Sequence, residues 1–280
     1  MKHRTGNFRG TGDMSIYYQY WEPDGPAKAL LLIVHGAGEH SARYQDVAAY
    51  FTQHDYTVVA LDHPNHGESD GSYGHVDSFD DFVQTLDIFH QQVSAEFSGL
   101  PQFLLGHSMG GLISCLYLLQ QQSAFVGCVL SGPAIKTDIE PGLLQMLLIR
   151  VLSKVAPKAG VLALDANGVS RDPAVVDKYV NDPLVNHGKM SARKVAELFR
   201  GMQQIQSSAG EIKLPILLLH GEADAMASAE GSRFLHSSIS SSDKTLKIYP
   251  ELYHEIFNEP ERESVLADVL AWCDARLARA

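Results

Sequence analysis

Residues 103–111 read FLLGHSMGG, a short apolar run followed at once by a Gly-x-Ser-x-Gly motif and then by a helical pattern. In such a motif a strand turns so sharply into a helix that the serine backbone is strained, and side chains two residues to either side would collide. The turn pushes Ser108 into a cleft, and the positive end of the next helix points toward the serine oxygen. The motif therefore predicts that Ser108 is a nucleophile.

Similar apolar runs, without alternation of polar and apolar residues, recur on both sides of this motif. They cover residues 29–34, 56–61, 125–130 and 216–219. Amphipathic helical patterns lie between or after them, at residues 79–97, 109–121 and 260–277. Such runs are typical of parallel strands covered by helices on both faces. The order of strands and helices predicts an α/β fold with a doubly wound, mostly parallel sheet, and the alternation at residues 15–21 predicts an antiparallel edge hairpin.

One segment interrupts this order. About eighty residues between the strand ending near Gly132 and the strand starting at Pro215 have helical patterns and no convincing strand. We predict a single domain with a core of residues 1–133 and 214–280 and a helical cap insertion of about residues 134–213. The first insertion helix, which includes Leu143 and Leu147, is apolar around much of its circumference. Its wide apolar stripe is compatible with two positions. The helix could be buried beneath the rest of the insertion, as helices with such stripes usually are, or it could form a lid that faces a substrate tunnel or lipid.

A serine hydroxyl is a poor nucleophile and needs a base that is itself oriented by a carboxylate. In this kind of fold the partners follow the serine in the order Asp or Glu, then His. Asp224 comes at the end of residues 217–224 (LLLHGEAD), with Glu222 as the nearby alternative. His254 follows the last predicted strand, residues 246–249. Its position distinguishes it from the other histidines and predicts a triad of Ser108, Asp224 and His254.

A substrate carbonyl that becomes tetrahedral also needs two backbone N–H groups aimed at its oxygen. One donor is expected from the residue after the nucleophile, Met109. The other is expected from the loop after the strand at residues 29–34, which reads HGAG at residues 35–38. Its glycines allow the backbone a close approach to the substrate, so we predict that Ala37 is the second donor.

Several of these stretches together resemble α/β-hydrolases of the monoacylglycerol lipase type. They are residues 35–44 (HGAGEHSARY), 62–71 (DHPNHGESDG), 106–111 (GHSMGG), 179–184 (YVNDPL) and 243–254 (DKTLKIYPELYH), and they extend over nearly the whole chain. The resemblance implies an α/β-hydrolase fold and a serine esterase that releases a fatty acid and glycerol through an acyl-enzyme. It also implies a cap that covers an apolar acyl tunnel and associates with membranes.

Other functions remain compatible with the residues. Lysophospholipase and small-ester carboxylesterase activities use the same triad, and a peptidase or a non-catalytic hydrolase-fold binding protein is a more distant alternative. Phe257 and Ala227 stand where the animal enzymes have a histidine and a cysteine. Glu39 and Arg43 fit either the polar end of a substrate pocket or an ion pair that holds their loop.

Composition limits the partners. The 280 residues carry a formal net charge of −11 without a basic block, which argues against nucleic acid. No apolar run follows the basic residues near the N-terminus, so no secretory segment is expected, and no run reaches the roughly 18 residues of a spanning helix. We expect a cytoplasmic protein whose peripheral membrane contact, if present, comes from the apolar insertion helix. The sequence does not indicate an oligomeric state.

Histidine and cysteine are the residue types that could bind a metal or form disulfides. His63 and His66 are three residues apart, but no second ligand cluster accompanies them, so no metal and no cofactor are predicted. The three cysteines, Cys115, Cys128 and Cys273, lie in apolar stretches without CxxC spacing. They are predicted to be buried thiols.

Overall fold

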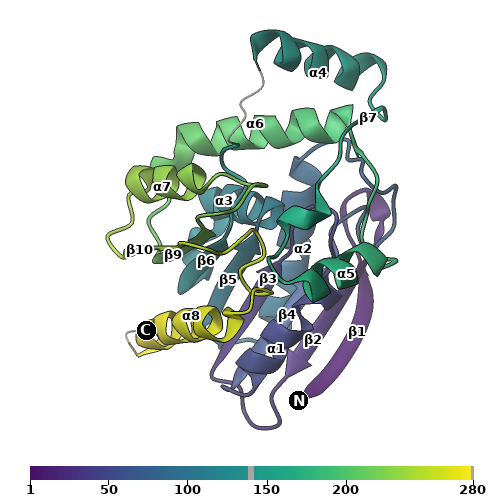
Figure 1. Ribbon diagram of the computed structural model, residues 1–280. Coiled ribbons are helices and arrows are strands. Elements are labelled where there is room, and N and C mark those ends of the chain that lie inside the picture. Colours follow the sequence, from purple (N-terminus) through teal and green to yellow (C-terminus); the bar gives the residue numbers. More distant parts are fainter. Residues whose placement is uncertain (138–141, 279–280) are drawn as a thin grey trace.

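A central sheet forms the middle layer of the molecule (Figure 1). The structure is a computed structural model that describes residues 1–137 and 142–278. Within these residues the sheet has eight strands in the order β1-β2-β4-β3-β5-β6-β9-β10. The strands are β1 (Lys2–Arg9), β2 (Ser15–Glu22), β3 (Ala29–Val34), β4 (Tyr56–Leu61), β5 (Gln102–His107), β6 (Gly127–Ser131), β9 (Ile216–Gly221) and β10 (Lys244–Tyr249). From β4 to β10 neighbouring strands are parallel.

The sequence-based prediction of the fold class is confirmed. Strands β3 and β4 have the predicted bounds, and β5 and β9 extend the predicted runs by one to two residues. The edge hairpin is also present, because β1 and β2 pair antiparallel in a register that joins Arg9 to Ser15. Strand β2 in turn pairs antiparallel with β4, which leaves β1 at the sheet edge.

Helices cover both faces of the sheet. Helices α2 (Asp80–Glu96), α3 (Met109–Gln121) and α7 (Ala229–Ser238) pack on one face, and α1 (Gln45–Thr52) and α8 (Arg262–Leu277) pack on the other (Figure 1). The apolar run of β3 does not alternate with polar residues because both faces of this strand are buried. Leu30 and Leu32 enter the core cluster on one face, and Leu31 and Ile33 enter the cluster on the other. All six residues of β3 are buried, as expected for a central parallel strand.

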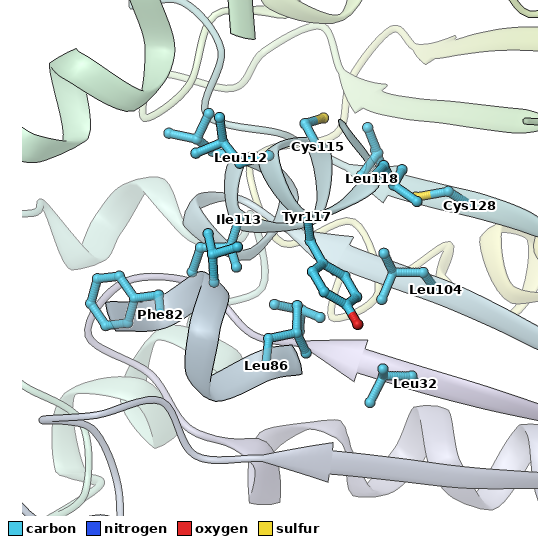
Figure 2. Packing of buried hydrophobic residues seen from close by; sticks show 14 of the residues in the cluster. Leu32, Phe82, Leu86, Leu104, Leu112, Ile113, Cys115, Tyr117, Leu118 and Cys128 are labelled. Carbon is cyan, nitrogen blue, oxygen red and sulfur yellow. The ribbon is translucent and has the colours of Figure 1, made fainter. Parts of the chain in front are cut away.

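Helix α3 lies in the core on one side of the sheet (Figure 2). The figure shows residues of α3 packed together with residues of α2 and of the strands, namely Leu112, Ile113, Cys115, Tyr117 and Leu118, with Phe82 and Leu86 of α2 and Leu32, Leu104 and Cys128 of the sheet. The three cysteines are free and buried, which confirms their assignment as buried thiols. Burial raises the pKa of the Cys115 thiol to about 12, so this thiol stays protonated at neutral pH.

The segment between β6 and β9 contains helices α4 (Leu143–Val155), α5 (Pro173–Asn181) and α6 (Ala192–Ser208). It also contains an antiparallel pair of short strands, β7 (Gly160–Leu162) and β8 (Met190–Ser191), which the sequence analysis did not predict. Strands of three and two residues are too short to show a periodic pattern. Helix α6 packs against α3 and against α4, so it lies between α4 and the sheet (Figure 1).

Helix α4 turns much of its apolar surface outward. Five of its large apolar side chains are 47% to 82% exposed: Leu144, Leu147, Leu148, Val151 and Val155. The interpretation of this stripe as a helix buried beneath the rest of the insertion is therefore wrong, because α4 packs on the outer side of α6. None of the helices that the structure describes is long and apolar enough to cross a membrane.

Candidate active site

Ser108 occupies the turn between β5 and α3 in a strained backbone conformation. Its φ is +52° and its ψ is −119°, a region that non-glycine residues rarely adopt. Backbone bonds hold it there: its amide donates to the Ser131 carbonyl at 3.0 Å, and its carbonyl accepts from the amides of Gly111 at 2.9 Å, Leu112 at 3.2 Å and Ala134 at 3.0 Å. The surrounding backbone thus fixes a conformation that places the Ser108 side chain at the amino end of α3.

The glycines of the motif have no room for a side chain. A Cβ atom on Gly106 would lie 2.4 Å from the Ser114 hydroxyl oxygen. On Gly110 it would lie 2.0 Å from the carbonyl oxygen of Val34, an atom of the neighbouring strand end that cannot swing away. Any side chain at either position would therefore collide with neighbouring atoms, as expected from the spacing of glycines around Ser108.

Asp224 and His254 form a close buried pair. The Nδ1–H of His254 donates to Oδ2 of Asp224 at 2.6 Å, and the side chains are 5% and 0% exposed. The other oxygen, Oδ1, accepts from the amides of Met226 at 2.7 Å and Ala227 at 3.0 Å. Glu222, the alternative acid, is exposed and pairs with Arg233. The structure therefore brings Asp224, and not Glu222, to His254.

The pKa values of this pair shift in opposite directions. Burial alone raises the pKa of Asp224, but His254 and the hydrogen bonds from His220 and His254 outweigh it and leave the pKa below its usual range. Burial lowers the pKa of His254, but the charge and hydrogen bond of Asp224, with further charge from Glu255 and Glu39, raise it above the ordinary value. Asp224 is ionised at neutral pH, and its charge stabilises the imidazolium form of His254.

One apolar cavity contains both Ser108 and His254. Apolar side chains from the insertion and the core make up most of its wall: Leu162, Leu164, Val169, Met190, Leu198, Phe199, Met202, Met226 and Ala227. Polar groups are confined to a few positions, which include Glu39, Tyr179 and Glu255. A second cavity, which reaches Met146 of α4, shares three lining residues with the first: Thr137, Phe199 and Met202. The two cavities therefore adjoin each other beneath α4.

Ala37 and Met109 line the same cavity as Ser108. Within the described residues, no hydrogen bond uses the amide of either one as a donor. The loop of Ala37 is held from both sides: the Gly36 amide donates to Glu39 Oε1 at 2.6 Å, and the Gly38 carbonyl accepts from Asn186 at 2.8 Å. A Cβ on Gly36 would lie 3.1 Å from the Cβ of Ser108. Both of these free amides thus belong to residues that border the cavity of Ser108.

Known proteins are similar to this chain over most of its length. The profile of the family described as serine aminopeptidase, S33, matches residues 25–261. A monoacylglycerol lipase of Mycolicibacterium smegmatis is 38% identical over 97% of each chain, and the human monoglyceride lipase is 35% identical over 95% of this chain and 88% of its own. This chain belongs to the monoacylglycerol lipase family of α/β-hydrolases. The solved monoacylglycerol lipase of Paleococcus ferrophilus superposes with a TM-score of 0.82 at 29% identity, covering 100% of both chains.

In this family member, Glu39 and Arg43 take part in a buried ion network. Arg43 donates to both oxygens of Glu255 at 2.6 and 2.7 Å and to Glu39 at 3.0 Å, and its guanidinium lies 4.7 Å from the ring centre of Tyr179. Glu39 also accepts from Tyr44 at 2.8 Å. Glu39 borders the cavity of Ser108, whereas Arg43 lines a smaller neighbouring cavity. The structure thus forms the ion pair considered above and does not bring Arg43 to the lipase-family site.

The structure does not bring Leu147 to the site either. Its side chain is 58% exposed on α4, and it is not among the residues that line the cavity of Ser108. The physical reason is the position of α6, whose residues Leu198, Phe199 and Met202 form the wall that Leu147 was expected to form. Leu143 begins α4, but its side chain lies outside what the structure describes.

Sequence reasoning missed the contribution of α6 to this lipase-family site. The signal was present, because Leu198, Met202 and Ile205 repeat at four and three residues, as on one face of a helix. Tyr179 and Met190 also line the cavity, but no periodic pattern in the sequence around them indicates this. His63 and His66 each use one ring nitrogen for a backbone contact, since Nε2 of His63 donates to the His35 carbonyl at 3.1 Å and Nδ1 of His66 donates to the Pro64 carbonyl at 2.9 Å. These bonds give both histidines a structural role.

Proposed function

We propose that this protein is a monoacylglycerol lipase that hydrolyses the ester between one fatty acyl chain and glycerol. The observation that carries the proposal is a single apolar cavity lined by the strained Ser108, by His254 with its buried partner Asp224 behind it, and by the two residues with free amides. The family relationship supports the same conclusion. Each of these groups has a defined task in acyl transfer.

The reaction proceeds in two halves. His254 accepts the Ser108 proton as the hydroxyl oxygen attacks the ester carbonyl carbon, and the amides of Ala37 and Met109 donate to the oxygen that becomes negative. His254 then gives its proton to the departing glycerol oxygen, which leaves an acyl ester on Ser108. Water repeats the sequence, with His254 again as the base, and releases the fatty acid and free Ser108. Asp224 stabilises the imidazolium in each half.

The acyl chain is proposed to lie in the cavity beneath the insertion. We propose that residues 134–213 form a cap on a core of residues 1–133 and 214–280. Met190 and the α6 residues Leu198, Phe199 and Met202 would then contact the chain. The second cavity, bounded by Met146 and Gln206, continues toward α4 and offers a route for the chain from outside.

The charge of the cavity supports glycerol over a phosphate-containing head group. Of the described residues that line it, Glu39 and Glu255 are carboxylates and none is a lysine or arginine. Arg43, the nearest guanidinium, is held by both of these carboxylates. A phosphate in this cavity would face net negative charge without a cationic partner, at a cost in binding free energy. A neutral alcohol avoids this cost.

A comparison of matched substrates tests the proposed activity. We expect 1-monoacylglycerol to be hydrolysed at least tenfold faster, in kcat/KM, than lysophosphatidylcholine with the same acyl chain, and an aminoacyl anilide to show no turnover. A preference for the lysophospholipid would assign the chain to lysophospholipases, and anilide cleavage would assign it to peptidases. Absence of turnover, together with absence of a fluorophosphonate adduct on Ser108, would indicate a non-catalytic binding protein.

We further propose that α4 contacts the lipid surface that holds the substrate. Its exposed Leu147 and Leu148, both 58% exposed, and the more exposed Leu144 form an apolar face on the outer side of α6. The net charge of −11 gives no electrostatic attraction to anionic lipid. Burial of apolar side chains in the interface would therefore supply the binding free energy.

Vesicle binding measures this contact. Wild-type protein is expected to bind neutral phosphatidylcholine vesicles with little dependence on salt. The double variant Leu147→Asp/Leu148→Asp should bind at least tenfold more weakly, because two apolar side chains are lost from the interface. Its kcat/KM on a short water-soluble p-nitrophenyl ester should stay unchanged. Ile88→Asp, at a 39% exposed position on α2, is the matched control. Binding that needs anionic lipid and disappears in salt would contradict the proposal.

A further inference from the structure

A second histidine contacts the carboxylate of the proposed triad. His220 lies near the end of β9, four residues before Asp224, and its side chain is fully buried. Its Nε2 is 3.1 Å from Oδ2 of Asp224 and 3.0 Å from the carbonyl oxygen of Ala227. Its Nδ1 is 2.7 Å from the hydroxyl of Ser232 on α7. The ring therefore connects the triad carboxylate to a helix on the face of the sheet.

These contacts determine where the ring carries hydrogen. A carbonyl oxygen and an ionised carboxylate oxygen only accept hydrogen bonds, so Nε2 of His220 carries a hydrogen and donates to both. Nδ1 pairs with the hydroxyl of Ser232, which can both donate and accept a hydrogen bond. Every polar atom of the imidazole is thus used, which explains how it is buried without loss of hydrogen bonding.

The contact of His220 with Asp224 helps to fix the orientation of the Asp224 carboxylate. Oδ1 accepts two backbone amides, and Oδ2 accepts one N–H from His254 and one from His220. Without His220, Oδ2 would have only His254 as a donor. The carboxylate could then turn about its Cβ–Cγ bond, and more of its negative charge would be concentrated on the one bond to His254.

We propose that His220 is a positioning residue, whose Nε2–H fixes Oδ2 of Asp224 toward His254 and limits how strongly the carboxylate retains the proton on His254. The inference rests on the triad role proposed above for Asp224 and His254. His220 does not line the cavity of Ser108, so it acts through Asp224 and not on the substrate.

Loss of this N–H has two predicted effects. The looser carboxylate orients His254 less well, so kcat should fall while KM stays within about twofold, because no substrate contact changes. The more basic carboxylate should raise the pKa of His254, so the fraction of neutral base at a given acidic pH decreases. The acid limb of kcat/KM should therefore move to higher pH.

The experiment compares two substitutions of His220 in the full-length protein. His220→Leu removes both ring nitrogens, and we expect kcat to fall about ten- to a hundredfold, with the acid limb shifted up by about half a pH unit or more. His220→Gln keeps an N–H donor at about the reach of Nε2 and should restore most of kcat and the pH profile. Should the leucine variant not fold, His220→Phe keeps the ring volume without the donor and takes its place.

His90→Leu controls for the loss of a buried histidine. His90 is 6% exposed on α2 and contacts Tyr117 and Gln102, outside the proposed triad. This variant should lose stability but keep the wild-type kcat and pH profile. A His220→Leu protein with reduced thermal stability but unchanged kcat and acid limb would overturn the inference and leave His220 a structural residue only.

A measurement without turnover separates this inference from the proposed function. The low-field proton resonance of His254 Nδ1–H, followed by NMR as the pH is changed, reports the titration of His254 directly. We expect its midpoint to rise in His220→Leu and to return in His220→Gln. If the wild-type protein hydrolyses no ester, the proposed function fails, yet this titration still tests the coupling. An unchanged midpoint in the leucine variant would contradict it.

Discussion

Ester turnover by a Ser108→Ala variant is expected to be about 10⁶-fold lower than that of the wild-type protein. The substitution removes only the Oγ atom that attacks the carbonyl carbon. The Cβ atom, the backbone bonds to Ser131 and Ala134 and the Asp224–His254 pair do not depend on that oxygen. The variant should therefore fold with nearly unchanged stability, and initial rates on 1-monoacylglycerol together with thermal unfolding check both expectations. Wild-type activity in this variant would exclude the proposed mechanism.

The strained backbone at residue 108 should also make a glycine variant unusually stable at this position. Because φ is +52°, alanine at this position keeps the strain of the serine, whereas glycine adopts such a conformation easily. The free energy of unfolding of Ser108→Gly should equal or exceed that of Ser108→Ala. At an unstrained position a glycine variant is instead less stable than the alanine variant by about 1 kcal/mol. Urea unfolding of the two inactive variants measures the difference. A glycine variant less stable by that full amount would show that the turn stores no strain.

Replacement of Lys194 by methionine is expected to stabilise the protein at neutral pH. Lys194 is 1% exposed in the first turn of α6, and its amine lies 3.1 Å from Nε2 of His66. Burial lowers the pKa of this amine from 10.5 to about 7, which corresponds to a cost of about 5 kcal/mol in folding near neutral pH. Methionine avoids this cost but leaves His66 without its partner, at about 1–3 kcal/mol. The net gain in the free energy of unfolding should be about 2–4 kcal/mol.

The pH dependence identifies the cause. Between pH 7 and 9.5 the unfolded chain holds a proton on Lys194 that the folded chain has released, so the free energy of unfolding of the wild-type protein rises with pH over this range. The Lys194→Met protein lacks this contribution, so the stability difference between the two should shrink as the pH increases. Urea unfolding at several pH values measures it. Lys178→Met, an exposed lysine on α5, serves as the control, and a methionine variant that is less stable than wild type at pH 7 would refute the prediction.

Local patterns in the sequence were sufficient to predict the parallel strands of the central sheet and the order of the proposed catalytic residues. Apolar runs such as residues 29–34 are continuous because both faces of β3 are buried, and this property depends on the fold class alone. Likewise, the positions of Ser108 and Asp224 follow from where parallel strands end. Such features need no knowledge of which distant residues come together.

Features that depend on distant contacts could not be predicted. The stripe on α4 shows that the helix has an apolar face, but the stripe is the same whether another element covers that face or solvent does. Arg43 and Glu255 are 212 positions apart, and no spacing rule connects them. His220 appeared as an ordinary strand residue, because its contact to Ser232 depends on where α7 packs against β9.

The docking of α4 on lipid, proposed above from its exposed apolar face, has a consequence for how the rate of hydrolysis depends on substrate. A chain that docks on a lipid surface through Leu144 and Leu147 encounters its substrate within a two-dimensional film. The rate then follows the mole fraction of monoacylglycerol in that surface and not the amount in the whole volume. Diluting the substrate with inert phospholipid at constant total monoacylglycerol should slow hydrolysis, whereas adding buffer should not.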